Sequence, residues 1–237
     1  MIELRNIQKK YNKLEVLKGI STTFNQSKCV ALIGPNGCGK TTMIKSILGM
    51  VLPDKGEILF NGQYIAGETS YRKHIGYMPQ IGRYPENMSI VQIFEMMKEL
   101  RNSSVELDDE LYSEYKLQNI LNKRMRTLSG GTTQKVSAAL AFMFNPDVYI
   151  LDEPTAGLDP IASEILKDKM MREKANGKLI LITSHLLSDL DELVSELVFM
   201  QDGKLLIHQA VEEIKQSTGE QKISKAIAKI LKEQTHE

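Results

Sequence analysis

The chain is poor in cysteine, has no excess of either charge and lacks a long apolar run. Its two cysteines, Cys29 and Cys38, are too few for a disulfide framework, which favours a reducing compartment. The 30 Lys and Arg residues balance the 30 Asp and Glu residues, so no overall field attracts nucleic acid or an anionic membrane face. We therefore expect no nucleic-acid partner.

No segment is long and apolar enough to cross a bilayer. The longest apolar stretch, Val136 to Leu151, is interrupted by Asn145, Pro146 and Asp147. Residues 1–30 also lack the basic start and apolar run of a signal peptide. Any membrane process that this protein serves therefore needs another chain to span the membrane.

The apolar residues predict an α/β protein with a helical middle third. With 237 residues, 42% of them hydrophobic, the chain has room for one large domain or two small ones. Residues 2–33 and 57–60 are typical of short strands, and residues 42–50 of a helix. Helical spacing recurs within residues 88–143, at Ile90, Ile93, Phe94, Met97, Leu100, Leu111, Tyr115 and Leu117.

The last third predicts a strand, a helix and a second strand. Residues 148–151 and 179–183 are continuous apolar runs, typical of strands buried in a parallel sheet. Residues 162–175 between them favour a helix, which makes a βαβ unit. Residues 211–237, rich in Lys and Glu, predict one or two amphipathic helices.

A glycine-rich segment between the predicted strand 29–33 and the predicted helix 42–50 fits the pattern G-x-x-x-x-G-K-[ST]. Its glycines let the backbone wrap a phosphate, and the helix adds the positive end of its dipole. Lys40 is expected to reach the β- and γ-phosphates, and the Thr41 hydroxyl to hold Mg²⁺. The predicted cradle consists of Gly34, Pro35, Asn36, Gly37, Cys38, Gly39, Lys40 and Thr41.

An acidic pair ends the predicted strand 148–151. At the end of a parallel strand these carboxylates would lie beside the phosphate cradle. Asp152 is then placed to hold Mg²⁺, through water, and Glu153 to orient or deprotonate the attacking water. The pair alone would equally suit a solvated acidic turn before Pro154, so the prediction depends on the cradle upstream.

A second anion site is predicted where Ser129, Gly130 and Gly131 precede a helix over residues 132–142. Ser129 is expected to cap that helix, while the glycines leave its N–H groups open. Because the first cradle already has its own phosphate, the simplest arrangement is a second copy of the chain, rotated head to tail. Each nucleotide would then lie between one cradle and the partner's Ser129. On these residues alone, an ordinary helix cap would be the better interpretation.

Taken together, these motifs resemble the nucleotide-binding domain of ABC transporters over nearly the whole chain. Seven of that family's motifs occur in the family's order. They are Tyr11 (the adenine-stacking aromatic), Gly34 to Thr42 (Walker A), Gln80 (the Q-loop), Leu128 to Gly131 (the signature), Val148 to Glu153 (Walker B), Ala156 to Asp159 (the D-loop) and His185 (the switch histidine).

The resemblance implies a P-loop NTPase: a RecA-like core with a parallel sheet and an antiparallel N-terminal β portion, plus an α-helical subdomain. It implies ATP and Mg²⁺ as cofactors, with Gln80 contacting Mg²⁺ and sensing the membrane subunit, and with Thr42 and Asp159 at the nucleotide. His185 would complete the site by a hydrogen bond to the γ-phosphate. Within one domain, residues 1–85 and 144–210 would form the core, 86–143 the helical subdomain and 211–237 a C-terminal extension.

Two positions depart from the family's pattern. Thr132 stands where the signature usually has glutamine, which puts any contact through that position in doubt. Cys38 stands where the cradle usually has serine or alanine. A thiol beside a helix N-terminus is often reactive, so oxidation or metal binding at Cys38 is one hypothesis. The alternative, that any small residue fits there, is the stronger one.

The resemblance implies a cytoplasmic subunit, peripheral on the inner face of the cell membrane, that drives a separate multi-span permease. One module per chain suggests the ABC-2 export or maturation type. Residues 77–88 and 140–160 resemble the ATPase subunits of copper-linked systems that mature nitrous oxide reductase. An exporter ATPase for another substrate and a soluble ABC ATPase acting on ribosomes or DNA remain alternatives. The presence of both Glu153 and His185 argues against a catalytically dead module.

Overall fold

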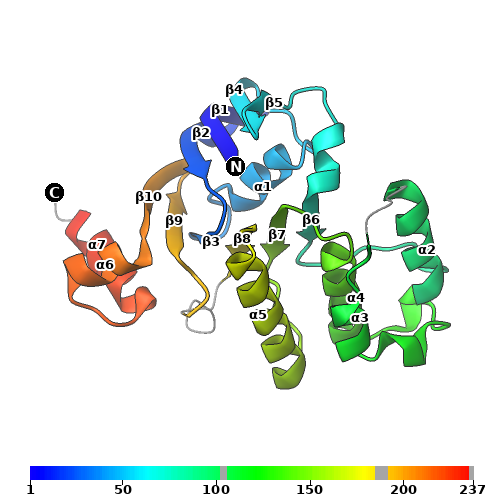
Figure 1. Cartoon of the computed structure of the whole chain (residues 1–237). Helices are drawn as coiled ribbons and strands as arrows, with labels where there is room; N and C mark the ends of the chain where they lie inside the picture. The colour runs from blue at the N-terminus through cyan, green and yellow to red at the C-terminus, as the bar shows by residue number, and fades with distance from the viewer. Residues whose placement is uncertain (102–105, 185–191, 235–237) are drawn as a thin grey trace. The chain divides into compact units, whose positions relative to one another are not determined.

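The computed structural model describes residues 1–101, 106–184 and 192–234, with side chains to residue 230 (Figure 1). By its internal contacts the chain divides into two compact units. Unit 1 comprises Met1–Arg72 and Leu181–Glu237, and unit 2 comprises Lys73–Ile180. Within the described residues, no helix has the length and apolar content that crossing a membrane requires.

Unit 1 contains an antiparallel sheet, as the sequence predicts. Its strand order is β2-β1-β4-β5, formed by β1 (Ile2–Tyr11), β2 (Leu14–Phe24), β4 (Lys55–Phe60) and β5 (Gln63–Tyr64). Ile2 and Leu4 point into the core, and so does Ile7, although it lies an odd number of positions, three, after Leu4. A register shift between Leu4 and Ile7, where Asn6 has a φ of 51°, keeps both on the buried face.

The second sheet portion of unit 1 carries the glycine-rich segment. The fully buried strand β3 (Cys29–Ile33) pairs in parallel with β9 (Glu196–Gln201), which pairs antiparallel with β10 (Lys204–Ala210). The pairing of β3 with β9 agrees with the parallel core sheet that the family resemblance implies. The sequence analysis does not single out β9 and β10, although residues 197–200 form a continuous apolar run and Asp202 (φ 49°) and Gly203 (φ 78°) form the turn of their hairpin.

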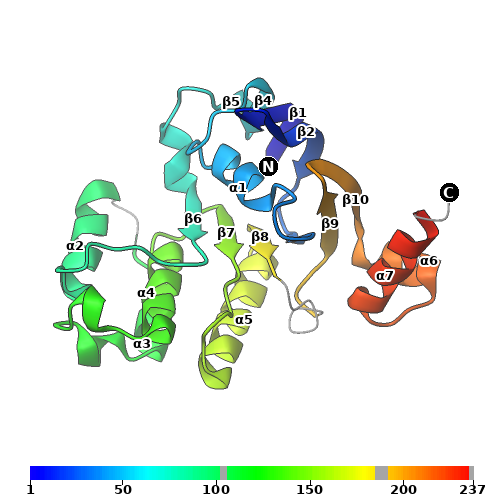
Figure 2. The ribbon, with the colours of Figure 1, turned by 180° about the vertical axis from the view of Figure 1, so that it is seen from behind.

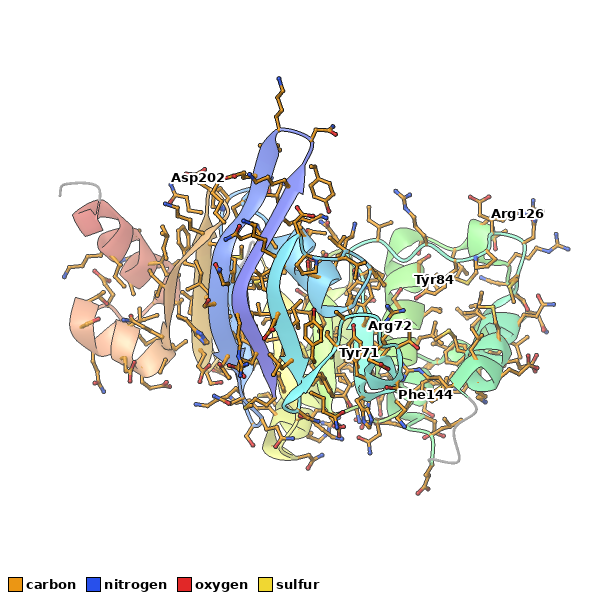
Figure 3. The ribbon with its side chains drawn as sticks, turned by 90° about the horizontal axis from the view of Figure 1, so that it is seen from above. Tyr71, Arg72, Tyr84, Arg126, Phe144 and Asp202 are labelled. Atoms are coloured by element: carbon orange, nitrogen blue, oxygen red, sulfur yellow. The ribbon has the colours of Figure 1, made fainter. Side chains whose placement is uncertain are left out.

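Helix α1 (Lys40–Ile47) begins and ends earlier than the predicted 42–50. Its end is closed by Gly49, with a φ of 66°, and by a bond from the Met50 N–H to the Lys45 carbonyl. Two side chains labelled in Figure 3 bind the same end: Tyr71 donates to the Ile47 carbonyl and Arg72 to the Gly49 carbonyl. A side chain at Gly49 would clash with both Tyr71 and Arg72, so the end of the helix requires glycine at this position.

The predicted C-terminal helices are present as α6 (Val211–Thr218) and α7 (Ile223–Gln234), which lie side by side in Figures 1 and 2. Each buries an apolar face, through Val211 and Ile214 in α6 and through Ile223 in α7. The amphipathic pattern of the sequence is therefore confirmed.

Unit 2 contains the predicted strand at 148–151 and a helical segment before it. Strand β7 (Val148–Asp152) pairs in parallel with β6 (Ile75–Met78). Strand β8 (Leu179–Thr183) coincides with its prediction, and the division into units falls within it, between Ile180 and Leu181. The described helices of unit 2 are α2 (Ile90–Arg101), α3 (Glu110–Glu114), α4 (Gly130–Phe142) and α5 (Pro160–Ala175). Two short 3-10 turns, η2 (Leu117–Ile120) and η3 (Met125–Thr127), lie between α3 and α4. In α2, Ile90, Ile93 and Phe94 are buried but Leu100 is 74% exposed, so the apolar stripe ends before the helix does. The division into core and helical subdomain stays a prediction.

A buried ammonium ties α5 to the segment that leads into α3. The Lys169 side chain is 5% exposed and pairs with Asp108, with Glu110 at 3.0 Å and with Glu173 at 3.0 Å. Burial alone would lower the pKa of Lys169, but the hydrogen bonds to these carboxylates outweigh it and raise that pKa above its ordinary value. Removing this single charge would leave carboxylates of both segments without their shared cation.

Candidate functional site

The glycine-rich segment, which we call the P-loop (Gly34–Thr41), joins β3 to α1 and packs closely on neighbouring strands. A Cβ atom at Gly34, where φ is +148°, would lie 2.1 Å from the Met200 carbonyl oxygen of β9. At Gly39, with φ +108°, it would lie 2.8 Å from the Val16 carbonyl oxygen of β2. These two positions therefore require glycine, both for space and for backbone conformation.

The Lys40 ammonium lies within the P-loop. Its Nζ donates to the Gly34 carbonyl oxygen at 2.7 Å and to the Pro35 carbonyl oxygen at 3.2 Å. Gly39, the N-cap of α1, has no side chain that could bind the first N–H groups of the helix. A positive charge and open N–H groups in one loop are suited to a phosphate. Pro35, Asn36, Gly37 and Thr41 are exposed and Thr42 is half-buried.

The Cys38 side chain is buried beneath the loop. A Cβ atom at Gly34 would lie 2.8 Å from Cys38 Sγ, and Lys40 Nζ is 3.9 Å from the same sulfur. An oxidant or metal ion would reach this thiol only after the loop moved. The geometry favours the interpretation that a small residue simply fits there.

Tyr11 ends β1 in unit 1, with 46% of its surface exposed. The Lys9 ammonium is 5.6 Å from the centroid of its ring. Asn12, with a φ of 55°, then turns the chain towards β2. An exposed ring is suited to stacking on a base, and the adenine contact stays a prediction.

The acidic pair follows β7 in unit 2, at the same edge as Gln80. Strands β6 and β7 run parallel with Met78 opposite Leu151, so residues that follow either strand emerge at one edge of the pair. Asp152 is buried and close enough to Tyr77 for its charge to add to burial in raising the pKa of that phenol. Gln80 is exposed and Glu153 half-buried.

Ser129 is the N-cap of α4, which confirms the predicted cap. Its Oγ accepts from the Thr132 N–H at 3.2 Å and lies 2.9 Å from the Thr132 hydroxyl. The helix begins at Gly130, before the predicted position, and both glycines lie in its first turn. A Cβ atom at Gly130 would meet no atom of the described residues within 4 Å, whereas one at Gly131 would lie 2.6 Å from the Gly157 carbonyl oxygen.

Asp159 has two partners within unit 2. Its Oδ1 accepts from the Ala162 N–H at 2.9 Å, as the N-cap of α5, and its Oδ2 accepts from Lys135 Nζ at 2.6 Å. The hydrogen bond from Lys135, followed by that from Ala162, lowers the pKa of the Asp159 carboxyl. Sequence reasoning did not single out Lys135, or its neighbour Gln134, which lies 3.5 Å from the Glu153 carbonyl oxygen. Both precede the apolar run of α4, a position that could have drawn attention to them.

The predicted site residues therefore fall into two groups. Tyr11, the P-loop and Thr42 belong to unit 1, and the other described ones belong to unit 2. The predicted Mg²⁺ ligands Thr41, Gln80 and Asp152 each carry an oxygen donor, the ligand type that Mg²⁺ prefers. Within the described ranges, three or more His, Cys, Asp or Glu side chains nowhere gather as a metal cluster. His185 lies outside the described residues.

Solved structures of ATP-binding cassettes share this fold. The chain is similar to an ATP-binding subunit of an ABC transporter, with a TM-score of 0.90, 28% identity and coverage of 98% of this chain and 99% of that one. It is also similar in fold to a dimeric post-hydrolysis cassette bound to ADP and Pi, with a TM-score of 0.79, 21% identity and coverage of 89% and 98%. The P-loop NTPase fold implied by the sequence is thereby confirmed.

Curated relatives agree with these structures. The chain is 31% identical over 208 residues to the Nod factor export ATP-binding protein I of Burkholderia orbicola, covering 86% of this chain and 68% of that protein. It is 32% identical over 218 residues to the ABC transporter ATP-binding protein YtrB of Bacillus subtilis, covering 91% and 74%. The family described as ABC transporter matches residues 17–156, more than half of the sequence. The chain therefore belongs to the ABC transporter family.

Proposed function

We propose that this chain is the ATP-hydrolysing motor subunit of an ABC transporter. Two copies would bind head to tail around two ATP molecules and drive a separate multi-span permease from the cytoplasmic face of the membrane. One observation carries this proposal: the same chain has two helix starts that are suited to a phosphate. One is the P-loop with Lys40, and the other is the start of α4, where a Cβ atom at Gly130 would meet no described atom within 4 Å. Two anion-binding helix starts on one polypeptide suit a nucleotide shared between two copies.

The phosphate-binding roles follow from charge and position. Lys40 and the P-loop N–H groups would bind the β- and γ-phosphates, and the exposed ring of Tyr11 would stack on adenine. Ser129, Gly130 and Gly131 of the partner copy would contact the γ-phosphate from the other side. Mg²⁺ neutralises the developing phosphate charge when bound, with Thr41, Gln80 and Asp152 holding it.

The hydrolytic roles belong to Glu153 and His185. The Glu153 carboxylate would accept a proton from, or orient, the water that attacks the γ-phosphate. His185 would donate a hydrogen bond to that phosphate. Asp159, at the start of α5, would approach the nucleotide site from the D-loop. Dimer closure would follow ATP binding, and hydrolysis would reopen the dimer.

Replacing Glu153 by glutamine tests the hydrolytic role. The Glu153→Gln variant should bind ATP and dimerise, yet lose turnover by about 100-fold or more, because a neutral amide is no proton acceptor. Gel filtration with and without ATP measures the dimer, and phosphate release measures turnover. Glu164→Gln is the matched control, since Glu164 is an exposed α5 residue paired with Lys167. Parent-rate hydrolysis by Glu153→Gln would refute this assignment.

Replacing Ser129 by arginine tests the shared site. A bulky charged side chain at the cap of α4 should prevent ATP-dependent dimerisation while leaving ATP binding to the P-loop intact. Filter binding of labelled ATP and gel filtration distinguish these two properties. If Ser129→Arg hydrolyses ATP as fast as the parent, the nucleotide is not shared between copies.

The transported substrate is the finer question. Relatives named for Nod factor export favour an export-type system. A second candidate is copper-site maturation of nitrous oxide reductase, favoured by the resemblance of residues 77–88 and 140–160. Neighbouring genes for a multi-span permease and a periplasmic repeat protein would support it. Deleting the gene should then yield nitrous oxide reductase with depleted copper, and fully copper-loaded enzyme would exclude this candidate.

A further inference from the structure

The backbone at Glu153 adopts an unfavourable conformation. Its φ is 50°, in the left-handed region that glutamate rarely adopts. It also precedes Pro154, and the proline ring favours extended conformations of the residue before it. A conformation with both disadvantages persists only where the surrounding structure holds it, and such positions cluster at functional sites.

Two donors hold the Glu153 carbonyl group in this conformation. The Ala156 N–H donates at 3.1 Å and closes the turn that follows β7. Gln134 Nε2, in the second turn of α4, donates to the same oxygen at 3.5 Å. This second bond is at the upper limit of hydrogen-bond length, so the Ala156 N–H is the stronger of the two donors. Through this contact α4 reaches the Glu153 peptide.

Burying the Gln134 carboxamide costs free energy. The residue is 4% exposed, and Val136 and Ala138 on the same helix are fully buried. A buried carboxamide must find hydrogen-bond partners or destabilise the fold, whereas an apolar residue of similar size would not. An amide at this position is therefore explained by the group that it binds.

The geometry points to Gln134 as a positioning residue for ATP hydrolysis: it fixes the Glu153 peptide and, through it, the direction of the Glu153 carboxylate. The peptide orientation sets the ψ angle of Glu153, and φ and ψ together determine where the side chain points. Gln134 is buried and binds the Glu153 backbone, so we assign it a positioning role and not a catalytic one.

This role rests on the proposed function and extends it. Helix α4 starts at Ser129, the residue proposed to contact the partner's nucleotide, and carries Gln134 in its next turn. A nucleotide bound at the start of α4 therefore acts on the general base of the same chain. In each copy, binding of the partner's nucleotide at Ser129 would then influence hydrolysis of the nucleotide in that copy's own P-loop.

The variant Gln134→Met tests this role, because it keeps the side-chain length and removes the donor. In the full-length protein we expect kcat for ATP to fall roughly 10- to 100-fold while KM changes less than about twofold, as for a misdirected general base. The matched control is Ser137→Ala, one turn further along α4. Ser137 is equally buried but accepts from the Tyr84 hydroxyl (2.9 Å; Figure 3 labels Tyr84). That control should lower the melting temperature and leave kcat within about twofold.

A second measurement separates positioning from general damage. In the Glu153→Gln background, adding Gln134→Met should leave residual hydrolysis unchanged, because the group that Gln134 directs is already neutral. A further fall there, or a parent-like kcat in Gln134→Met alone, would overturn the inference while leaving the proposed function intact. Parent-rate turnover in Glu153→Gln alone would instead overturn the proposed function. If Gln134→Met does not fold, Gln134→Leu provides the same comparison.

Discussion

The P-loop and the start of α4 both place glycines at the beginning of a helix, but for different reasons. In the P-loop, Gly34 and Gly39 are surrounded by the backbone of β9 and β2 within unit 1. At the start of α4, a side chain on Gly130 would meet nothing within unit 2. The glycines of the P-loop are thus required by internal packing, whereas Gly130 leaves space for something outside its unit.

Gly131 shows that adjacent glycines can differ in the same way. A side chain there would press on the Gly157 carbonyl oxygen, so Gly131 serves the contact between α4 and the turn before α5. The same residue type therefore has a structural role at one position and, by proposal, a binding role at the next. The comparison predicts which substitutions change stability and which change activity alone.

The largest effect is expected for Gly34→Ala. The added methyl group would overlap the Met200 carbonyl group at a φ of +148°, so we expect the free energy of unfolding to fall by about 3 kcal/mol or more. Urea denaturation measures it. Gly37→Ala is the control: its φ is +80° but the space is open, so only the conformational cost of roughly 1 kcal/mol applies. Equal losses in the two variants would contradict the packing argument.

A smaller effect should separate Gly131→Ala from Gly130→Ala. We expect the first to lower the free energy of unfolding by about 1–3 kcal/mol, because the methyl group would meet the Gly157 carbonyl oxygen. The second should raise it by up to about 1 kcal/mol, since alanine is the better helix former. Thermal unfolding and ATPase assays on both variants provide the test.

The informative result is the activity of Gly130→Ala. If the space at this glycine receives the partner's nucleotide, a stable Gly130→Ala protein should still hydrolyse ATP more slowly than the parent. A stable variant with full activity would mean that the space at Gly130 serves no binding role.

The smallest effect is expected from the hydrogen bond by which Lys135 of α4 binds Asp159, the N-cap of α5. Lys135 holds the pKa of Asp159 below its ordinary value, so the Asp159 contribution to stability is present at neutral pH and is lost as pH falls through that lowered pKa. In Lys135→Met, the pKa of Asp159 should rise towards its ordinary value, so its contribution to stability should be smaller and its loss should be complete at a higher pH. NMR titration of the carboxyl carbon measures this shift. Lys167→Met, which affects Glu164 instead, should leave the Asp159 titration unchanged.

The sequence predicts those parts of the fold that depend on local residue order. Strands β7 and β8 are continuous apolar runs, and Ser129 has the residue type of a cap. Strand β6 escaped prediction because Gly76, packed against the Ala141 carbonyl oxygen, interrupts its short apolar run. Helix α1 ends early because Tyr71 and Arg72, distant in sequence, bind its last turn.

In the candidate site, too, the sequence predicts the residues that belong to local motifs and misses those that depend on tertiary contacts. The P-loop, Asp152 and Glu153 follow from motifs with a defined spacing, which one sequence displays. Gln134 and Lys135 were not predicted, because their importance depends on which residues fold back against α4. The left-handed conformation of Glu153 was equally hidden, since it arises from a turn and not from residue type.

The packing around the P-loop also bears on the order in which the protein can fold during synthesis. The Gly34 backbone packs against the Met200 carbonyl group, and Gly203 donates from its N–H to the Cys38 carbonyl at 3.2 Å. A ribosome must therefore deliver residue 203 before the loop at residue 34 can close. Until then the apolar strand β3 lacks its β9 neighbour and is exposed to misassociation. Nascent chains shorter than this should bind chaperones and not nucleotide.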